Sequence, residues 1–447
     1  MTTSPFLADE FASGLLAERR PAPDGEFLPH VVAWNLTRRC NLKCSHCYIS
    51  AGPGESGAGE LDTAACFRVI DQLLELNPAP MLILSGGEPL LRADLAEIAA
   101  HASGQGATVV VGTNGTLLTD ARIASLMAAG VTGVAVSVDS LRPEYHDRFR
   151  RGTDALADTT AALARMRKSR LDFIVQTTAT RGNAREVPSL LMWAAEQGAV
   201  SFNLYFLVPT GRGGQLTDLT ADEYESLLGE LAEYERRYRG TMMVRAKCAP
   251  HFIRKVYEES PDSSLLDYQT RCPCGIQYCR ITPEGRLTPC PYTPEVAGDL
   301  TQQTFGEIWN GSTLFQDLRR RELGGKCGRC EYRLVCGGCR ARAFAATGDH
   351  LAADPSCAYE PDGTRPLIRR REVTYGAPAR PALAWSDMAT QRLARIPSFV
   401  RGVVVQRIED YARKRGISTI TPELLAEIRG TMPLDFSRKK PFFLRHD

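Results

Sequence analysis

Three cysteines near the beginning of the chain carry its clearest chemical signal. Cys40, Cys44 and Cys47 have the spacing C-x3-C-x2-C. Three thiolates on one short loop can hold three irons of a cubane 4Fe–4S cluster, which leaves the fourth iron open to a substrate or a cofactor. Zinc is the alternative, but structural zinc sites combine four ligands, commonly from paired C-x2-C knuckles, and this stretch has no fourth cysteine. The spacing therefore favours an iron–sulfur cluster with one open iron.

A second group of cysteines lies between residues 272 and 357. Its members are Cys272, Cys274, Cys279, Cys290, Cys327, Cys330, Cys336, Cys339 and Cys357. The C-x2-C pairs in this group also occur in zinc ribbons, so on its own the group leaves zinc open as an alternative to clusters. Two cysteines stand apart from both groups. Cys66 falls in an expected amphipathic helix and is interpreted as a small core residue, whereas Cys248 fits no pattern.

Composition and charge limit the class of protein. A chain of 447 residues is too long for one ordinary core, so two or three domains are expected. The net charge of +2 gives no general attraction to nucleic acid. The chain has no run of about 18 apolar residues and its first 25 residues lack a signal-peptide core, which predicts a cytoplasmic protein without a membrane span. Disulfides are rare in that reducing compartment, so the 14 cysteines are better explained as metal or cluster ligands.

The segment from residue 30 to about residue 245 alternates short apolar runs with helical patterns. The strand-like runs are 31–36, 81–84, 108–111, 134–138, 173–177 and 202–208. Six βα units in succession imply a parallel sheet, flat or curled into a partial (β/α)6 barrel. Chemistry in such folds gathers at the carboxyl ends of the strands. The cysteine triplet comes directly after the first run, so we expect it at that end.

The pattern changes at about residue 246. Cysteine, glycine and proline crowd together there and long apolar periodicity is rare, which predicts a part held by metal rather than by a large core. Helical patterns return after a linker rich in proline and arginine. We therefore expect an α/β fold in five segments: an extension at 1–28, the partial parallel barrel at 29–245, a cysteine-rich auxiliary cluster domain at 246–363, the linker at 364–381 and a small helical domain at 382–447.

Motifs at the ends of the expected strands resemble those of the radical SAM superfamily. They are Tyr48 after the cysteine triplet, Gly86-Gly87-Glu88-Pro89 after the second run, Gly112-Thr113-Asn114-Gly115 after the third, Ser137-Val138-Asp139 at the end of the fourth, Thr178 and Thr180 after the fifth, and Leu207-Val208-Pro209 after the sixth. Each motif is common by itself. All of them together, in the order of the family and behind C-x3-C-x2-C, identify the chain as a member of that superfamily.

The resemblance implies a cofactor and a role for each motif. The triplet would hold a 4Fe–4S cluster that binds S-adenosylmethionine, and the backbone of Gly86 and Gly87 with the Glu88 carboxylate would hold the amino group of that cofactor. Thr113, Asn114, Ser137 and Asp139 are implied near its ribose and its methionine carboxylate. Thr178 would be a further polar contact, and Val208 would lie beside its adenine. The implied chemistry is reductive cleavage of S-adenosylmethionine to a 5′-deoxyadenosyl radical, which takes a hydrogen atom from the substrate.

The second cysteine group resembles the SPASM extension of many radical SAM enzymes, which binds two auxiliary 4Fe–4S clusters. Gly285-x4-Cys290 is followed by Cys327-x2-Cys330-x5-Cys336-x2-Cys339 and later by Cys357. The last gap is two residues instead of the commoner three, and three upstream candidates stand where the family has at most two. The resemblance implies one cluster on Cys327, Cys330, Cys336 and Cys357. The other would use Cys290, Cys339 and two of Cys272, Cys274 and Cys279.

Other stretches resemble enzymes that act on tetrapyrroles. The runs 146–150, 207–213 and 336–342 are similar to enzymes of alternative haem synthesis, which decarboxylate iron-coproporphyrin, and to their relatives in nitrite-reductase haem maturation. The tail from Trp385 to Arg429 resembles the small helical domain of the light-independent protochlorophyllide reductase. Arginine suits carboxylates, so the candidates to pair with propionates are Arg148, Arg150, Arg151 and Arg212.

The leading hypothesis is therefore a radical SAM oxidoreductase or lyase that modifies a tetrapyrrole, with a flavodoxin- or ferredoxin-type electron donor. The first alternative is a SPASM peptide maturase that modifies a ribosomally made precursor. Such enzymes usually carry a recognition domain before the barrel, and about 28 residues precede the first expected strand. The second alternative is an iron–sulfur electron-transfer scaffold without catalysis. The intact Gly86–Pro89 motif argues against it, because a scaffold does not need a site for S-adenosylmethionine.

Overall fold

The computed structural model describes residues 27–431 apart from 217–218, 262, 264, 269–270, 321 and 370–377. Most of the expected extension at 1–28, the centre of the expected linker at 364–381 and the end of the expected tail after residue 431 lie outside the described residues. Of the helices in the described part, none has the length and apolar character needed to cross a membrane.

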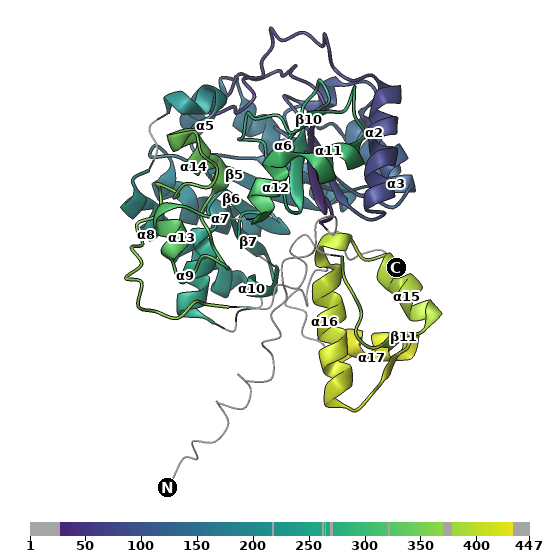
Figure 1. Ribbon diagram of the computed structural model, residues 1–447. Coiled ribbons are helices and arrows are strands. Elements are labelled where there is room, and N and C mark those ends of the chain that lie inside the picture. The colour runs from purple at the N-terminus through teal and green to yellow at the C-terminus, as the bar shows by residue number, and fades with distance from the viewer. Residues whose placement is uncertain are drawn as a thin grey trace.

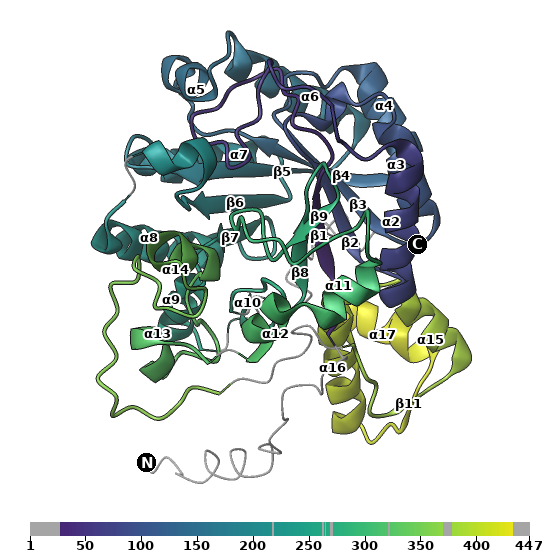
Figure 2. The same ribbon diagram turned by 45° about the horizontal axis from the view of Figure 1, so that its top comes forward.

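One ten-stranded sheet organises most of the described chain, in the order β10-β9-β8-β1-β2-β3-β4-β5-β6-β7 (Figures 1 and 2). The strands are β1 (Val31–Asn35), β2 (Met81–Ser85), β3 (Thr108–Thr113), β4 (Val131–Ser137), β5 (Phe173–Ala179), β6 (Ser201–Phe206), β7 (Met243–Lys247), β8 (Tyr278–Ile281), β9 (Arg286–Thr288) and β10 (Gly298–Asp299). Strands β1 to β7 are parallel to one another and β8 is parallel to β1, whereas β9 is antiparallel to both β8 and β10 at one edge.

The six runs expected to be strands all form strands, and two further parallel strands join them. β7 continues the sheet beyond β6, and β8 pairs with the other side of β1. Neither of these two strands was predicted from the sequence. Apolar and basic residues alternate in β7, and β8 is short and lies among closely spaced cysteines. Because β8 comes from the cysteine-rich part, that part extends the barrel sheet.

Helices after the strands cover the outer face of the sheet (Figure 2). The main ones are α2 (Thr63–Leu76), α3 (Leu95–Gly104), α4 (Asp120–Ala128), α6 (Ala155–Ser169), α7 (Val187–Glu196) and α8 (Ala221–Tyr238). Two of these helices begin at well-formed N-caps. Asp62 accepts a hydrogen bond from the Ala65 amide at 2.8 Å, and Thr220 forms a reciprocal capping box with Glu223. These caps fix where α2 and α8 begin and therefore how they meet the sheet.

Side chains alternate between the two faces of each strand. One face of the sheet packs against the helices and forms the large core, and the other face lines the inside of the curve. Val32 and Trp34 of β1 point outward into the large core beneath the helices, as do Cys279 and Ile281 of β8. Several inward-facing residues near the amino ends of the strands are apolar, among them Met81, Val110, Ile174 and Met243. At the carboxyl ends the same registers carry polar residues, namely Asn35, Ser85, Ser137, Gln176, Tyr205, Lys247 and Arg280.

The tail forms a small domain with its own core. It contains β11 (Ala384–Trp385), α15 (Asp387–Ala394), α16 (Ser398–Lys414), β12 (Thr419–Ile420) and α17 (Pro422–Thr431). Apolar residues from all three helices and β12 pack together in it, among them Ala389, Ile408, Ile420, Leu424 and Ile428. The helical pattern expected after the linker is thus present.

The start of α16 closes the amino end of the sheet. Ile396, Phe399 and Val400 pack with inward-facing residues of β2, β3, β4, β5 and β7, namely Met81, Ile83, Val110, Ala135, Ile174 and Met243. A flat sheet of six strands would be about 24 Å wide, so the sheet curls to bring these strands to one short segment. The tail therefore sits at the end of the barrel opposite the cysteine triplet, roughly 20 Å away along the strands.

Polar contacts fix the same junction. The Ser398 hydroxyl lies 2.8 Å from His30 Nδ1 and accepts a 2.8 Å hydrogen bond from the Asn77 amide. The Ser398 backbone N–H also donates to the Ala79 carbonyl at 2.9 Å. All of these groups are buried, so each hydrogen bond replaces one that water would otherwise supply.

Replacing Val400 with aspartate tests this docking. Val400 is buried in the apolar base of the barrel, so V400D should lower the stability of the folded protein by more than about 2 kcal/mol because it buries an unpaired carboxylate. Met388 of α15 is 60 % exposed, so M388D is the matched control and should change stability by less than about 0.5 kcal/mol. Thermal unfolding of both variants measures the difference. Equal unfolding midpoints would contradict the docking.

Candidate active site

The cysteine triplet lies on the loop that leaves the carboxyl end of β1. Cys40, Cys44 and Cys47 pack there in one apolar group with Leu42 and Ile49, so the short spacing brings all three together. The loop folds back on itself, because the Cys40 amide donates to the Gly52 carbonyl and the Gly52 amide donates to the Arg38 carbonyl. Cys40 is buried, and Cys44 and Cys47 are half-buried.

Two of the four arginines that are candidates to pair with propionates contact other groups of the protein instead. Arg212 donates from Nε to the Cys44 carbonyl at 2.8 Å and from Nη2 to the Ala51 carbonyl at 2.7 Å, so it braces the cysteine loop. Arg150 is buried, and its guanidinium pairs with Asp139 at 2.5 Å. Its Nη1 lies 3.8 Å from the sulfur of Cys44. The sequence placed both residues in the site but did not reveal these partners.

The two glycines of the Gly86–Pro89 motif pack directly against the cysteine loop. A Cβ atom on Gly86 would lie 2.7 Å from the Thr37 carbonyl oxygen, and one on Gly87 would overlap the Arg39 carbonyl. Backbone hydrogen bonds cross the same interface, from the Gly87 amide to the Thr37 carbonyl at 2.7 Å and from the Glu88 amide to the Arg39 carbonyl at 2.9 Å. The glycines are therefore required for contact between two backbone segments.

The carboxylate of Glu88 is fully buried and joins the ends of β2 and β3. It accepts hydrogen bonds from the Thr113 hydroxyl at 2.8 Å, the Asn114 amide at 2.9 Å and the Leu90 amide at 3.1 Å. Asn114 in turn donates to the Asn41 side chain at 2.9 Å, next to Cys40. Burial raises the pKa of Glu88, although these hydrogen bonds oppose the shift. The structure thus brings Glu88, Thr113 and Asn114 together behind the cysteine loop.

The motif after β4 combines one interior residue with one buried ion pair. Ser137 lies in an inward register at the end of β4, and Thr178 is in the inward register of β5. The Asp139 carboxylate accepts from the Thr178 amide at 2.8 Å and faces Arg150. Burial raises the pKa of Asp139, but Arg150, His46 and His146 lower it by more. The net shift of the pKa is downward, so the carboxylate stays charged.

Tyr48 and Val208 face the cysteine-rich part of the chain. The Tyr48 hydroxyl accepts a 2.7 Å hydrogen bond from Asn35, and its ring lies 5.2 Å from that of Tyr292. Val208 is buried in an apolar group with four cysteines of the second set. Both residues therefore lie between the triplet and the cysteine-rich part.

The second set of cysteines divides into two groups and leaves one member outside. Cys272, Cys274, Cys290 and Cys339 share a buried group next to β7, and Cys248 packs against it. We call these five the proximal thiol group. Cys327, Cys330, Cys336 and Cys357 line a small cavity with Arg254 and Lys326, and we call them the distal thiol group. Cys279 lies in β8, faces outward and is fully buried in the main core.

Buried cations accompany both groups. Arg340 Nη2 lies 3.8 Å from the sulfur of Cys327 in the distal group. Arg342 pairs with Asp354 at 3.3 Å, and the Asp354 carboxylate also accepts from the Cys339 amide at 2.7 Å in the proximal group. Guanidinium groups beside sulfur favour the thiolate form, which is the form that binds metal.

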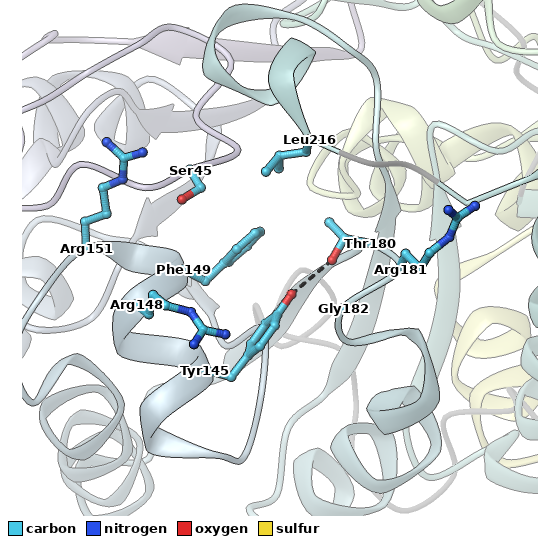
Figure 3. Close-up of a pocket in the computed structure, with 9 residues that line it drawn as sticks. All are labelled: Ser45, Tyr145, Arg148, Phe149, Arg151, Thr180, Arg181, Gly182 and Leu216. Atoms are coloured by element: carbon cyan, nitrogen blue, oxygen red, sulfur yellow. Dashed lines mark hydrogen bonds between the residues drawn. The ribbon is translucent and has the colours of Figure 1, made fainter.

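An open pocket of about 410 Å³ lies beside the cysteine loop. Its lining comes from Ser45 of that loop, from α5 (Pro143–Arg150) and from the segment after β5. Tyr145 and Phe149 project into it, and the Tyr145 hydroxyl lies 3.1 Å from that of Thr180 (Figure 3). Its three arginines are Arg148, Arg151 and Arg181, of which Arg151 and Arg181 extend from opposite sides (Figure 3).

Comparison with known proteins agrees with this arrangement. The pattern of the Radical SAM superfamily matches residues 34–191, and that of the iron-sulfur cluster-binding domain called SPASM matches 272–331. The AdoMet-dependent heme synthase of Methanosarcina barkeri is 40% identical over 343 residues, which cover 74% of this chain and 97% of that protein. The chain belongs to the radical SAM superfamily. Within it, the chain is a SPASM-containing enzyme of the heme synthase family.

Other relatives of this radical SAM enzyme rank the hypotheses about its substrate. The pre-heme d1 synthase of Dinoroseobacter shibae is 31% identical, with 73% of this chain and 85% of that protein covered. The mycofactocin maturase MftC of Mycobacterium tuberculosis is 29% identical, with 79% and 86% covered. The haem-related proteins are thus the more similar ones.

Two further matches concern the fold and the tail. The crystal structure of Streptococcus suis SuiB bound to S-adenosylmethionine superposes with a TM-score of 0.60 at 13% identity, covering 74% of this chain and 78% of that chain. This likeness supports the fold. The pattern of the proto-chlorophyllide reductase 57 kD subunit matches residues 385–429, so the resemblance of the tail is confirmed.

The cysteine triplet of this radical SAM enzyme fits a 4Fe–4S cluster chemically. Burial, together with the nearby Glu88, Cys44 and Cys47, raises the pKa of the Cys40 thiol to about 12, although the Leu42 amide opposes the shift. Burial also raises the pKa of Cys44, against the effect of Arg150. Three thiolates together therefore need a positive group between them, and iron supplies it. In the described part of the chain, no three His, Cys, Asp or Glu side chains lie close enough together to bind a single metal ion. A cubane cluster does not need such a group, because each cysteine binds a different iron.

Replacing Gly87 with alanine tests the backbone contact behind the cysteine loop. The added methyl overlaps the Arg39 carbonyl, so G87A should displace the loop, destabilise the protein by about 1–3 kcal/mol and lower the iron bound by the triplet. Gly104 at the end of α3 has open space around a Cβ atom, so G104A is the control and should retain normal iron. Iron analysis and thermal unfolding measure both effects. Normal iron in G87A would refute the requirement.

Replacing Arg150 with methionine tests the buried pair with Asp139. R150M leaves the Asp139 carboxylate buried without its cation, so the protein should lose roughly 3–5 kcal/mol of stability. The double variant D139N/R150M should recover much of that stability but still lack the cation near Cys44. We expect the reduction potential of the reconstituted first cluster to be lower in the double variant, as read by EPR-monitored titration. An unchanged potential would show that Arg150 serves only the fold.

Proposed function

We propose that this enzyme uses S-adenosylmethionine, bound at a 4Fe–4S cluster on Cys40, Cys44 and Cys47, to modify a propionate-bearing tetrapyrrole, most simply by oxidative decarboxylation. The names of its relatives support this substrate class, since they include an AdoMet-dependent heme synthase and a pre-heme d1 synthase. The observation that carries the proposal is the arginine-rimmed pocket beside the cysteine loop.

The roles of the strand-end residues follow from their contacts. The cluster with bound S-adenosylmethionine supplies the electron that cleaves this cofactor and so starts radical chemistry on a C–H bond. Gly86, Gly87 and Glu88 would present backbone to the cofactor, because the Glu88 carboxylate is already engaged by Thr113 and Asn114. Ser137 and Thr178 would offer hydroxyls from the barrel interior. Asp139 would keep Arg150 in position near Cys44.

The pocket suits a flat, carboxylated ring system. Aromatic side chains of Tyr145 and Phe149 offer surface on which such a ring can stack. Arg148 and Arg151 provide guanidinium groups that match carboxylates in geometry and charge. Phe149 stacks on His46, which lies between Cys44 and Cys47, with ring centroids 4.6 Å apart. The pocket wall is therefore continuous with the loop of the first cluster.

The two thiol groups support two auxiliary 4Fe–4S clusters within a domain that spans about residues 246–363. The distal group has four cysteines and the proximal group has at least four, each beside a buried arginine. Such clusters would take the electron that a substrate radical must lose during oxidative decarboxylation. A flavodoxin- or ferredoxin-type protein would supply the electron for the first cluster.

Titration with iron-coproporphyrin tests the substrate class. The anaerobically reconstituted enzyme should bind it with a change in its absorbance and, under reduction with S-adenosylmethionine, release carbon dioxide. C44A should bind the porphyrin but release no carbon dioxide.

R148Q/R151Q should weaken binding of iron-coproporphyrin by about tenfold or more, since each charge-assisted hydrogen bond contributes about 1.5–3 kcal/mol. R167Q, on the exposed face of α6, is the control. Absence of both binding and carbon dioxide release would favour a peptide substrate.

A further inference from the structure

Cys248, which no sequence pattern explained, lies in the proximal thiol group. It follows β7 directly, where the chain turns toward α9 (His251–Glu259), and it packs against the group that contains Cys272, Cys274, Cys290 and Cys339. A cubane cluster binds four cysteines, one on each iron. Five thiols at one cluster position leave one more than the cluster needs.

The backbone at Cys248 indicates that its side chain matters. Its φ of +58° is in the left-handed region, which glycine adopts easily and which strains a residue with a Cβ atom. The surrounding segment, Lys247 to Pro250, could place a glycine there without that strain. Such an outlier persists where the side chain has a function, and here the side chain faces a buried set of thiols.

Two of the other four thiols are too close together to act independently. The sulfurs of Cys272 and Cys274 lie 3.3 Å apart, with a single residue between the two cysteines. Ligands on separate corners of a cubane point away from one another, so these two sulfurs do not suit two different irons. One of them is the surplus thiol, and a fourth ligand must come from elsewhere in the group.

We propose that Cys248 is that fourth ligand, and that Cys248, Cys272, Cys290 and Cys339 hold the proximal auxiliary cluster while Cys274 does not. Cys274 is the surplus member of the pair, because its sulfur lies within hydrogen-bond reach of both Cys272 and Cys290. Arg342, buried next to Cys339, supplies positive charge close to Cys248 as well.

This ligand set joins the barrel to the cysteine-rich part. Cys248 belongs to the end of β7 at one edge of the parallel strands, whereas Cys272 lies on the segment that leads into β8, which pairs with β1 at the other side. A cluster on both cysteines would connect the two sides of the curled sheet across its opening. The proximal cluster would then contribute to the shape of the active-site end as well as to electron transfer.

The proposal rests on the auxiliary clusters proposed above, and one experiment separates the two. The full chain carrying C40A/C44A/C47A would be reconstituted anaerobically, so that only auxiliary clusters contribute about eight irons per chain. Iron content, Mössbauer spectra and low-temperature EPR of the reduced protein are the measurements. If this parent binds no iron, the proposal of auxiliary clusters fails, whatever the role of Cys248.

Single changes in that parent then test the ligand set. C248G relieves the backbone strain while removing the thiol, so we expect normal folding but altered EPR and loss of up to half of the remaining iron. C272A should have the same effect, whereas C274A should match the parent. C66A, a buried cysteine in α2, is the matched control and should also match the parent. Parent-like spectra for C248G, or altered spectra for C274A, would overturn the proposal.

Discussion

The active-site end of this enzyme depends on the close approach of two backbone segments. The Gly86–Gly87 turn lies against the first residues of the cysteine loop, and amide-to-carbonyl hydrogen bonds cross the contact from Gly87 and Glu88. No side chain larger than hydrogen fits between them. The buried Glu88 carboxylate then attaches the end of β3 to the same unit through Thr113 and Asn114. The cysteines are therefore positioned by strand ends that are fixed to one another.

Buried cations form the second common feature of the sulfur sites. Arg150 stands near Cys44, Arg340 near Cys327 and Arg342 near Cys339. Two of them are held by buried aspartates, Asp139 and Asp354. Burial opposes the charge of a thiolate, and a fixed guanidinium offsets that penalty without moving when the charge changes. The same arrangement thus accompanies all three groups of cysteines.

The helical tail performs a structural task at the far end of the barrel. Ser398 and Val400 close the amino end of the curled strands, where inward-facing residues would otherwise be exposed. Its family resemblance pointed toward a tetrapyrrole partner, but the strands of the barrel separate the described tail residues from the cysteine loop and the arginine-rimmed pocket. The pocket, rather than the tail, is the part of the structure that combines stacking surface with arginines next to the triplet.

The sequence by itself determined the chemistry and most of the elements. Local signals sufficed for the C-x3-C-x2-C loop, the six principal strands and the helical character of the tail, because each depends on neighbours a few residues away. It missed β7 and β8, whose place is decided by strand pairing rather than by composition. Only the tertiary structure decided that Cys279 faces the core, that Arg150 and Arg212 serve the cysteine loop, and that Cys248 joins cysteines up to 91 residues distant. Those outcomes depend on which strand faces and loops meet in space, and such contacts between distant residues leave no mark in local spacing.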